Sequence, residues 1–304
     1  MNPRISAVVN TLNEEKNLAY ALRSLTTWVD EVVVVDMHSD DRTVEIAREH
    51  GARVFLHERT SAPDGARAFA LSQAAGEWVI LLDADELVPA PLAERLRELA
   101  REGEWDVVKL PRRNYLLGDA VDHTGWGAEQ DAQLRFFRRD AILASDHIHA
   151  MFRPAEGARV LSLAPRPEHA LVHFAYLDTA HFLEKLNRYT TVEAEQAFAA
   201  KRRTTPAKAF LQVLREFATR YVRMGGWRDG WRGLYLSLFM AMYRAATAAK
   251  LEELARIGGR EEVRRAYGEV AEEVLSGYAF RSGDPGAKVS VSGAVSAKGA
   301  GGGE

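Results

Sequence analysis

Three carboxylates follow a continuous apolar segment in the first third of the chain. Residues 78–82 read Trp-Val-Ile-Leu-Leu, and Asp83, Asp85 and Glu86 come soon after. Five consecutive apolar residues predict a strand buried on both faces, and packing does not favour aspartate at its end. Carboxylates at the carboxyl end of a parallel strand suit a magnesium ion shared with substrate phosphates. The alternative is an acidic turn in which Asp85 or Glu86 only favours a helix over residues 89–101.

A second carboxylate, Asp36, ends another apolar segment that also predicts a buried strand. Amphipathic helices alternate with such segments, and strands are expected over residues 5–9, 31–35, 52–56, 78–82 and 106–110. This alternation predicts an α/β fold, with a mainly parallel, doubly wound sheet flanked by helices. Asp36 and Asp83 should then open on the same edge of the sheet. A dinucleotide site is not favoured there, because the first strand-to-helix turn, residues 10–13, contains no glycine.

The order of these motifs resembles the family 2 glycosyltransferases, which have the Rossmann-like GT-A fold. The resemblance covers roughly residues 4–178. Residues 9–15 are similar to the first nucleotide-binding turn of that family, and residues 33–43 are similar to its second. Asp83-Ala84-Asp85-Glu86 resembles its D-x-D metal motif. Within the family, the chain looks most similar to bacterial enzymes that build lipopolysaccharide core or other cell-surface glycans.

The resemblance implies that these motifs bind a nucleotide sugar, with Asp36 holding the base and Arg67 adding charge against the phosphates. The expected nucleotide-binding residues are Thr11, Asn13, Glu15, Asp36, Arg67, Asp83 and Ala84. Asp83 and Asp85 are expected to hold Mg²⁺ or Mn²⁺ on the diphosphate. Asn13 also has a structural interpretation, as the N-cap of the helix that follows. Ala68 departs from the asparagine that relatives commonly carry after the arginine, which puts that contact in doubt.

An inverting sugar transfer needs a general base that takes the proton of the acceptor hydroxyl. In the resembling family, this base is an aspartate just before a segment like residues 132–139, which points to Asp131. Glu129, two residues earlier, is the second candidate, since a small error of register would exchange the two. The structural alternative is that Asp131 pairs with Arg135 or Arg138 on the surface.

Three histidines follow, His147, His149 and His173. Imidazole completes metal shells and also contacts phosphate. The resemblance suggests that one histidine faces the diphosphate, with His149 and His173 as the candidate metal ligands. A lone histidine is more often a structural residue, so both interpretations stay open.

The pattern becomes helical after Asp178, which predicts three regions. These are a catalytic domain over residues 1–178, a helical extension over 179–281 and a disordered tail over 282–304. Residues 227–243 combine aromatic, apolar and basic side chains, as expected of a segment that lies in a membrane interface. The alternative is packing on the catalytic domain or on a second subunit. A last helix over residues 260–275 is expected to turn its apolar side inward, namely Val263, Tyr267, Val270 and Val274.

Composition narrows the function classes. The chain of 304 residues is 47% hydrophobic and 27% charged, has a net charge of −3 and contains no cysteine. Thiolate chemistry is therefore excluded, and general binding of nucleic acid is not expected. No apolar run reaches the length of a membrane span, and the N-terminal residues do not form a secretory signal. The expected location is the cytoplasm, with peripheral association at the inner face of the membrane as a further hypothesis.

The resulting prediction is an inverting, metal-dependent glycosyltransferase that uses a nucleotide-diphosphate sugar. UDP is the commonest nucleotide of the resembling family, and the acceptor would be a glycan or a lipid-linked glycan. Glycosylation of protein or peptide stays open, as does a homo-oligomeric state. One alternative is a nucleotidyltransferase of similar fold, although the turn at residues 10–15 is acidic rather than glycine-rich and basic. A second alternative is a glycan- or nucleotide-binding module without catalysis. The presence of Asp83, Asp85 and Asp131 argues against it.

Overall fold

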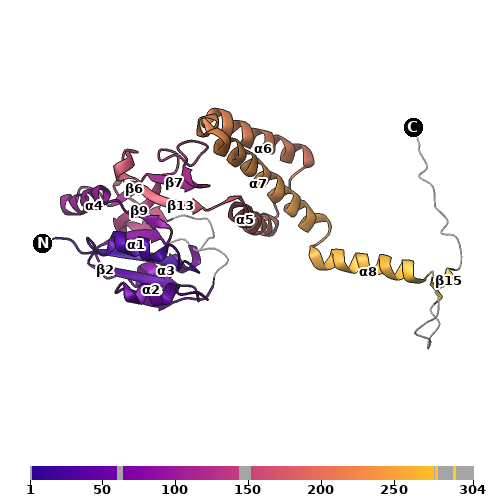
Figure 1. Ribbon diagram of the computed structural model, residues 1–304, viewed down its shortest axis with the longest axis horizontal. Coiled ribbons are helices and arrows are strands. Elements are labelled where there is room, and N and C mark those ends of the chain that lie inside the picture. Colours follow the sequence, from indigo (N-terminus) through magenta and orange to yellow (C-terminus); the bar gives the residue numbers. More distant parts are fainter. Residues whose placement is uncertain (1, 60–63, 144–151, 277, 280–289, 292–304) are drawn as a thin grey trace.

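The computed structural model describes residues 2–59, 64–143, 152–276, 278–279 and 290–291 (Figure 1). In the order of the chain, an α/β half is followed by a group of helices, and the last long helix projects away from both. His149, one of the two candidate metal ligands, lies outside the described residues, as does His147. So does most of the tail that was predicted to be disordered.

The α/β half is built on a seven-stranded sheet with the order β12-β6-β9-β4-β1-β2-β3. All neighbouring strands are parallel except β9, which runs antiparallel to both β4 and β6. The predicted mainly parallel α/β fold is therefore confirmed. The strands are β1 (Ile5–Thr11), β2 (Glu31–Asp36), β3 (Arg53–Leu56), β4 (Trp78–Asp83), β6 (Val107–Leu110), β9 (Gln133–Arg138) and β12 (Val160–Ser162).

Helices cover both faces of this sheet because its central strands are apolar on both sides. On β1, Ala7 and Val9 pack into one core while Val8 packs into the other. The first core is closed by α1 (Leu18–Leu25), α2 (Thr43–Glu49) and α4 (Ala90–Glu102). The second is closed by α3 (Asp64–Ser72). Trp78 stacks on Phe136 across β4 and β9 with ring centroids 4.7 Å apart, which fixes the antiparallel strand beside the metal-motif strand.

A second sheet of four strands, in the order β5-β13-β7-β8, continues from the end of β4. Its strands are β5 (Glu86–Leu87), β7 (Arg112–Leu116), β8 (Asp119–Ala120) and β13 (Leu171–Tyr176). Arg112 and the next four residues pair with β13. In the register of this sheet, His173 lies opposite both Glu86 and Asn114. The second sheet therefore brings a histidine from far along the chain to the metal motif.

The helical half contains α5 (Thr179–Ala199), α6 (Pro206–Ala218), α7 (Gly230–Arg256) and α8 (Arg260–Ser276). A π-helix over Thr219–Arg223 and a 3₁₀ turn over Gly226–Asp229 join α6 to α7. A third core lies between α5, α7 and the second sheet, and includes Phe182, Leu186 and Leu236. The helical half is therefore packed directly on the part of the chain that carries His173.

Two expectations about helices are wrong. Tyr267, Val270 and Val274 do not face inward, since Tyr267 is 73% exposed and the other two are also exposed on the projecting helix α8. Asn13 is not the N-cap of α1, which begins five residues later after Asn17. Asn13 instead has a left-handed backbone with φ of 57° and belongs to the preceding turn.

The remaining elements are short. They are β10 (Ile142–Leu143), β11 (Arg153–Pro154), β14 (Tyr278–Ala279), β15 (Ser290–Val291) and 3₁₀ turns over Arg139–Ala141 and Pro167–His169. Within the tail that was predicted to be disordered, only the two residues of β15 are described, and they pair with β14. Among the described helices, none has the length and apolar character needed to cross a bilayer.

Gly76 provides a test of the packing between β1 and the entry of β4. A Cβ atom at this position would lie 2.8 Å from the Ser6 nitrogen and 2.9 Å from the Arg4 oxygen, both in the backbone of the strand entry. We expect Gly76→Ala to lower the free energy of unfolding by about 1–3 kcal/mol, because the backbone must shift to admit the methyl group. Urea denaturation measures this change.

Gly268 is the matched control, because no atom lies within 4 Å of the position that a Cβ atom would take there and the residue sits on exposed helix α8. Gly268→Ala should leave stability unchanged or raise it by up to about 1 kcal/mol, as alanine is the better helix former. Equal effects of the two substitutions would contradict the packing described for Gly76.

Candidate active site

A cleft of about 670 Å³ lies between the carboxyl ends of β1 and β4, the second sheet and helix α5. This is the edge at which parallel α/β sheets bind ligands. Its walls come from four parts of the chain. They include Asn10, Asn13 and Glu14 from the first turn, Asp83, Ala84 and Asp85 from the metal motif, Arg67 from α3, and His173, His181, Lys185 and Arg188.

The first turn divides its polar residues between the cleft and the interior. Asn13 lines the cleft, and its side-chain oxygen accepts a hydrogen bond from the Asp40 nitrogen at 2.8 Å. Asp36 is buried, where it accepts hydrogen bonds from the Thr11 hydroxyl at 3.0 Å and from the Ser39 nitrogen at 2.8 Å. Glu15 is exposed and accepts a hydrogen bond from the Arg42 nitrogen. Thr11, Glu15 and Asp36 thus hold the two turns together and are not among the residues that line the cleft.

Asn10 is the polar group of this turn that has no protein partner. Its side chain is 7% exposed and lines the cleft. Neither its amide nitrogen nor its amide oxygen has a hydrogen-bond partner among the described residues. A buried amide left unpaired costs about 1–3 kcal/mol, so it marks a place where a polar ligand would stabilise the protein. Glu14 lies nearby, and burial raises the pKa of its carboxyl group despite a hydrogen bond from Asn17.

Asp83 is held by two guanidinium groups, one on each carboxylate oxygen. Arg67 lies 2.8 Å from Oδ1, and Arg135 pairs with Oδ2. Burial by itself would raise the pKa of Asp83, but the charges of Arg135 and Arg67 outweigh it and hold the pKa well below its usual range. Asp83 is therefore a permanent anion that orients Arg67 at the cleft wall.

Glu86, the third carboxylate of the motif, is fully buried and joins two arginines. Its Oε1 lies 2.9 Å from Arg135 and 2.9 Å from Arg112, and its Oε2 accepts a hydrogen bond from the Asp83 nitrogen at 3.0 Å. A buried carboxylate is tolerated when it is paired with charges and hydrogen-bonded on both oxygens. Glu86 therefore links β4, β7 and β9 at the end of the metal motif.

Asp85 faces His173 in the cleft. The His173 Nε2 lies 3.5 Å from the Asp85 carboxylate, and both side chains are about 85% buried. The other ring nitrogen, Nδ1, lies 2.5 Å from the side-chain oxygen of Asn114. Since the Asn114 amide nitrogen already donates to the Trp126 oxygen and to Asp131, its oxygen must accept from His173. This places a proton on Nδ1 and turns the other ring nitrogen, Nε2, toward Asp85.

Asp131 lies beside the cleft but does not line it, and three side chains fix its carboxylate. Arg112 lies 2.7 Å from Oδ2, Asn114 donates to the same oxygen at 2.8 Å, and Gln133 donates to Oδ1 at 2.7 Å. The expected alternative partners of Asp131 are wrong. Arg135 is buried against Asp83 and Glu86, and Arg138 pairs with Glu77 at 2.8 Å.

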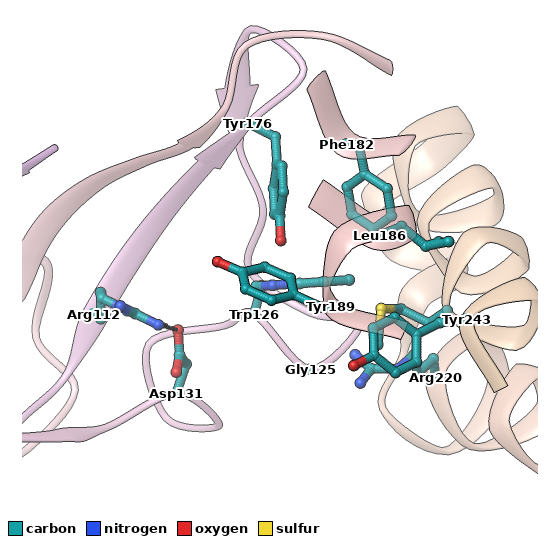
Figure 2. Close-up of a pocket in the computed structure, with 11 residues that line it drawn as sticks. Arg112, Gly125, Trp126, Asp131, Tyr176, Phe182, Leu186, Tyr189, Arg220 and Tyr243 are labelled. Atoms are coloured by element: carbon teal, nitrogen blue, oxygen red, sulfur yellow. Dashed lines mark hydrogen bonds and ion pairs between the residues drawn. The ribbon is translucent and has the colours of Figure 1, made fainter. Parts of the chain in front are cut away.

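A smaller cavity of about 230 Å³ opens beside Asp131 (Figure 2). Arg112 and Asp131 line it together with five aromatic side chains, namely Trp126, Tyr176, Phe182, Tyr189 and Tyr243. Gly125, Leu186, Arg220 and Met240 complete the lining. Burial and the neighbouring Tyr189 raise the pKa of Tyr176 to about 12, so its hydroxyl stays a hydrogen-bond donor at neutral pH. Rings that offer an apolar face and a hydroxyl at the edge suit a ligand with the same division, such as a sugar. Glu129 is exposed and lines neither cavity.

Helix α5 adds a basic wall opposite the metal motif. His181, Lys185 and Arg188 are spaced four and three residues apart, so they share one face of the helix and line the cleft. Burial and the charge of Lys185 lower the pKa of His181, which is therefore neutral at physiological pH. Lys185 and Arg188 carry the positive charge of this wall, which suits a diphosphate.

The structure thus brings together Asn13, Arg67, Asp83, Ala84, Asp85, His173 and Asp131, whereas His149 lies outside the described residues. Sequence reasoning missed Asn10, Arg112, Asn114, Lys185 and Arg188. The spacing of the basic residues on α5 was a readable signal. Asn114 and Arg112 gave none, because their roles depend on the pairing of β7 with β13.

Comparison with known proteins agrees with this geometry. The model of glycosyl transferase family 2 matches residues 6–156. The lipopolysaccharide core biosynthesis glycosyltransferase LpsC of Rhizobium meliloti (strain 1021) is 30% identical over 254 residues, which is 81% of this chain and 91% of LpsC.

Solved structures with partial similarity include two transferases. Glucosyl-3-phosphoglycerate synthase from Mycobacterium tuberculosis, in complex with Mn²⁺, UDP and phosphoglyceric acid, is 27% identical over 38% of this chain and 44% of that chain, with a TM-score of 0.32. The mannosyltransferase PcManGT from Pyrobaculum calidifontis, in complex with GDP-Man and Mn²⁺, is 20% identical over 90% and 81%, with a TM-score of 0.42. The match to LpsC across most of both chains, together with the family model, decides the assignment: the chain belongs to glycosyl transferase family 2 and is a glycosyltransferase.

Proposed function

We propose that this enzyme transfers a sugar, with inversion, from a nucleotide-diphosphate donor to a hydroxyl acceptor in the synthesis of a cell-surface glycan. One observation carries the proposal. The Asp85–His173 pair and the Asp131 carboxylate lie in adjoining cavities and are joined through a single buried side chain, Asn114. A donor held at the first and an acceptor held at the second would meet between them.

The donor is proposed to be a UDP-sugar bound in the larger cleft. Asn10 has an unpaired amide there, and Arg67, Lys185 and Arg188 supply positive charge. Charge of this kind stabilises a diphosphate leaving group as the glycosidic bond breaks. Support for UDP comes from the glucosyl-3-phosphoglycerate synthase complex, which holds UDP, whereas the mannosyltransferase complex holds GDP-Man. Asp36 acts on the nucleotide through the loop that it holds.

A divalent cation, Mg²⁺ or Mn²⁺, fits the donor set at the end of the metal motif. Asp85 would offer a carboxylate oxygen and His173 its Nε2 nitrogen, and both residues face the cleft. No cluster of three or more candidate ligands is preformed among the described residues, so diphosphate oxygens and water would complete the shell. When bound, the cation would neutralise charge on the leaving diphosphate. Asp83, with both oxygens paired to arginines, is proposed to orient the donor rather than to hold the cation alone.

Asp131 is proposed as the general base. It takes the proton of the acceptor hydroxyl while that oxygen bonds to the anomeric carbon and the diphosphate leaves from the opposite face. Inversion follows from this single displacement. The aromatic cavity beside Asp131 would stack the acceptor sugar and exclude water from the reacting hydroxyl.

The acceptor class is proposed from the relatives. LpsC acts in lipopolysaccharide core biosynthesis, and a more distant relative of 30% identity, covering 48% of this chain and 52% of its own length, is an undecaprenyl-phosphate 4-deoxy-4-formamido-L-arabinose transferase of Edwardsiella ictaluri (strain 93-146). A glycan on a lipid carrier or on lipopolysaccharide core fits both. The proposed location is therefore the cytoplasmic side of the membrane. Nucleotidyl transfer is not proposed, since the family is one of glycosyltransferases.

The first test measures the melting temperature with UDP, GDP, CMP or dTDP, each with and without Mn²⁺. A ligand at one hundred times its dissociation constant stabilises the folded protein by about 2.7 kcal/mol. We expect UDP with Mn²⁺ to raise the melting temperature by several degrees and Asp85→Asn to abolish the metal-dependent part. A shift that is equal in both proteins would contradict the assignment of Asp85.

Asn10→Leu should affect the stability of the free protein and the binding of the nucleotide in opposite directions. Replacing the unpaired amide by an apolar group of similar shape should maintain or raise the melting temperature of the free protein. The shift caused by UDP and Mn²⁺ should fall. If the free protein is destabilised and the nucleotide shift is intact, then Asn10 does not contact the donor.

Asp131→Asn should lower kcat by about 10²–10⁴-fold, since amide cannot accept the proton of the acceptor. Release of the nucleoside diphosphate in the presence of a glycan acceptor measures this rate. The nucleotide-induced shift in melting temperature should persist, because Asp131 lies outside the larger cleft.

Glu129→Gln is the matched control, two residues away and exposed. It should leave kcat within about twofold, as surface substitutions away from a site are usually near-neutral. Loss of turnover in this variant, with activity retained in Asp131→Asn, would exchange the roles of the two carboxylates.

A further inference from the structure

The α6–α7 hairpin carries large apolar side chains on its solvent side. We call these six the apolar face, with exposed fractions between 41% and 63%: Phe210 and Leu214 on α6, and Trp231, Tyr235, Leu238 and Met242 on α7. The expectation that this stretch packs inward holds only for its other side, where Phe239, Met240 and Tyr243 contact the third core. An exposed apolar patch with aromatic residues marks an interaction surface in a soluble domain.

The six side chains form one stripe on each of the two helices. On α7, Trp231, Tyr235, Leu238 and Met242 follow each other at intervals of four, three and four residues, which forms a single stripe. Helices α6 and α7 pack side by side and are joined by a tight turn over residues 219–229 (Figure 1). On α6, Phe210 and Leu214 are four residues apart and therefore share one face of that helix. Trp227, 61% exposed, lies in the turn that connects them.

This hairpin is also the basic part of an otherwise slightly acidic chain. Residues 201–250 contain eleven lysines and arginines and only two carboxylates, whereas the whole chain has a net charge of −3. Four of these cations, Lys208, Arg215, Arg223 and Arg228, are exposed on α6 and in the turn. None of the four has an ion-pair partner within the described parts of the chain. Their charge is therefore available to an anionic partner.

We propose that the apolar face, together with the four exposed cations of the same hairpin, docks this protein on the surface of an anionic lipid bilayer. Tryptophan and tyrosine favour the membrane–water interface, and arginine and lysine beside them are attracted to acidic headgroups. A second copy of the chain fits the face less well, because symmetric contact would bring the cations of both copies together. The inference goes beyond sugar transfer and does not depend on which donor is used.

The test is co-sedimentation of the full chain with vesicles at low salt. One set contains phosphatidylcholine alone, and the other contains phosphatidylglycerol in addition. We expect binding to the second set, about tenfold weaker binding to the first and loss of binding at high salt. Trp231→Ser/Tyr235→Ser should weaken binding to the anionic vesicles about tenfold or more, since these rings enter the interface.

Two further variants make the result specific. Tyr267→Ser/Val270→Ser removes equally exposed apolar side chains from α8, which carries five glutamates and three arginines, and should not change binding. Arg215→Glu/Arg223→Glu should remove the preference for anionic vesicles. The melting temperature of each variant, compared with that of the wild type, tests whether its fold is intact.

The proposal is overturned by any of three results. These are equal binding to both vesicle sets, equal binding of the α7 and α8 variants, or a dimer in solution that Trp231→Ser/Tyr235→Ser converts to monomer. If the membrane proposal is wrong, the nucleotide-dependent shift in melting temperature is still expected. If the proposed sugar transfer is wrong, that shift is lost and vesicle binding is still expected. The two outcomes are therefore distinguishable.

Discussion

The site depends on one buried carboxylate. Glu86 is inaccessible to solvent and is shared by Arg135 and Arg112, which in turn hold Asp83 and Asp131. Such an anion is stable only while both arginines stay in place, and each arginine is stable only while its carboxylates stay in place. Carboxylates and guanidinium groups therefore alternate from Asp83 to Asp131. This chain of ion pairs fixes the end of the metal motif and the candidate base relative to each other.

A second connection closes this arrangement into a ring. Asn114 donates to Asp131 and accepts from His173, and the second ring nitrogen of His173 faces Asp85. The residues proposed to hold the donor and the residue proposed to activate the acceptor are thus joined on two sides, through Glu86 and through Asn114. Preorganised groups of this kind are what a displacement reaction requires, because they do not have to reorient as charge moves. The helical half completes the site with the basic face of α5.

The features that depend on short stretches of sequence could be predicted. The alternation of apolar strands and amphipathic helices gave the parallel sheet, and the carboxylates at the ends of β2 and β4 located its functional edge. Sequence reasoning did not reach Arg112 or Asn114, because their meaning arises from a strand pairing some sixty residues apart in the chain. The prediction that the apolar side of α8 faces inward was also wrong. An apolar stripe indicates a surface that packs against something, but it does not identify the partner. The polar residues of the first turn were found as a group, but only the packed structure separates Asn10, which faces the cleft, from Asp36, which is internal.

The most direct test of the central claim is the turnover of Glu86→Gln, measured well below its melting temperature. Removing this charge should destabilise the protein by about 3 kcal/mol or more and lower kcat at least about tenfold in the population that is folded. The KM for the donor should change less, because Glu86 does not itself line the cleft and acts on the donor only through Asp83 and Arg112. A variant with wild-type stability and wild-type kcat would contradict the claim that one buried carboxylate holds the two halves of the site in register.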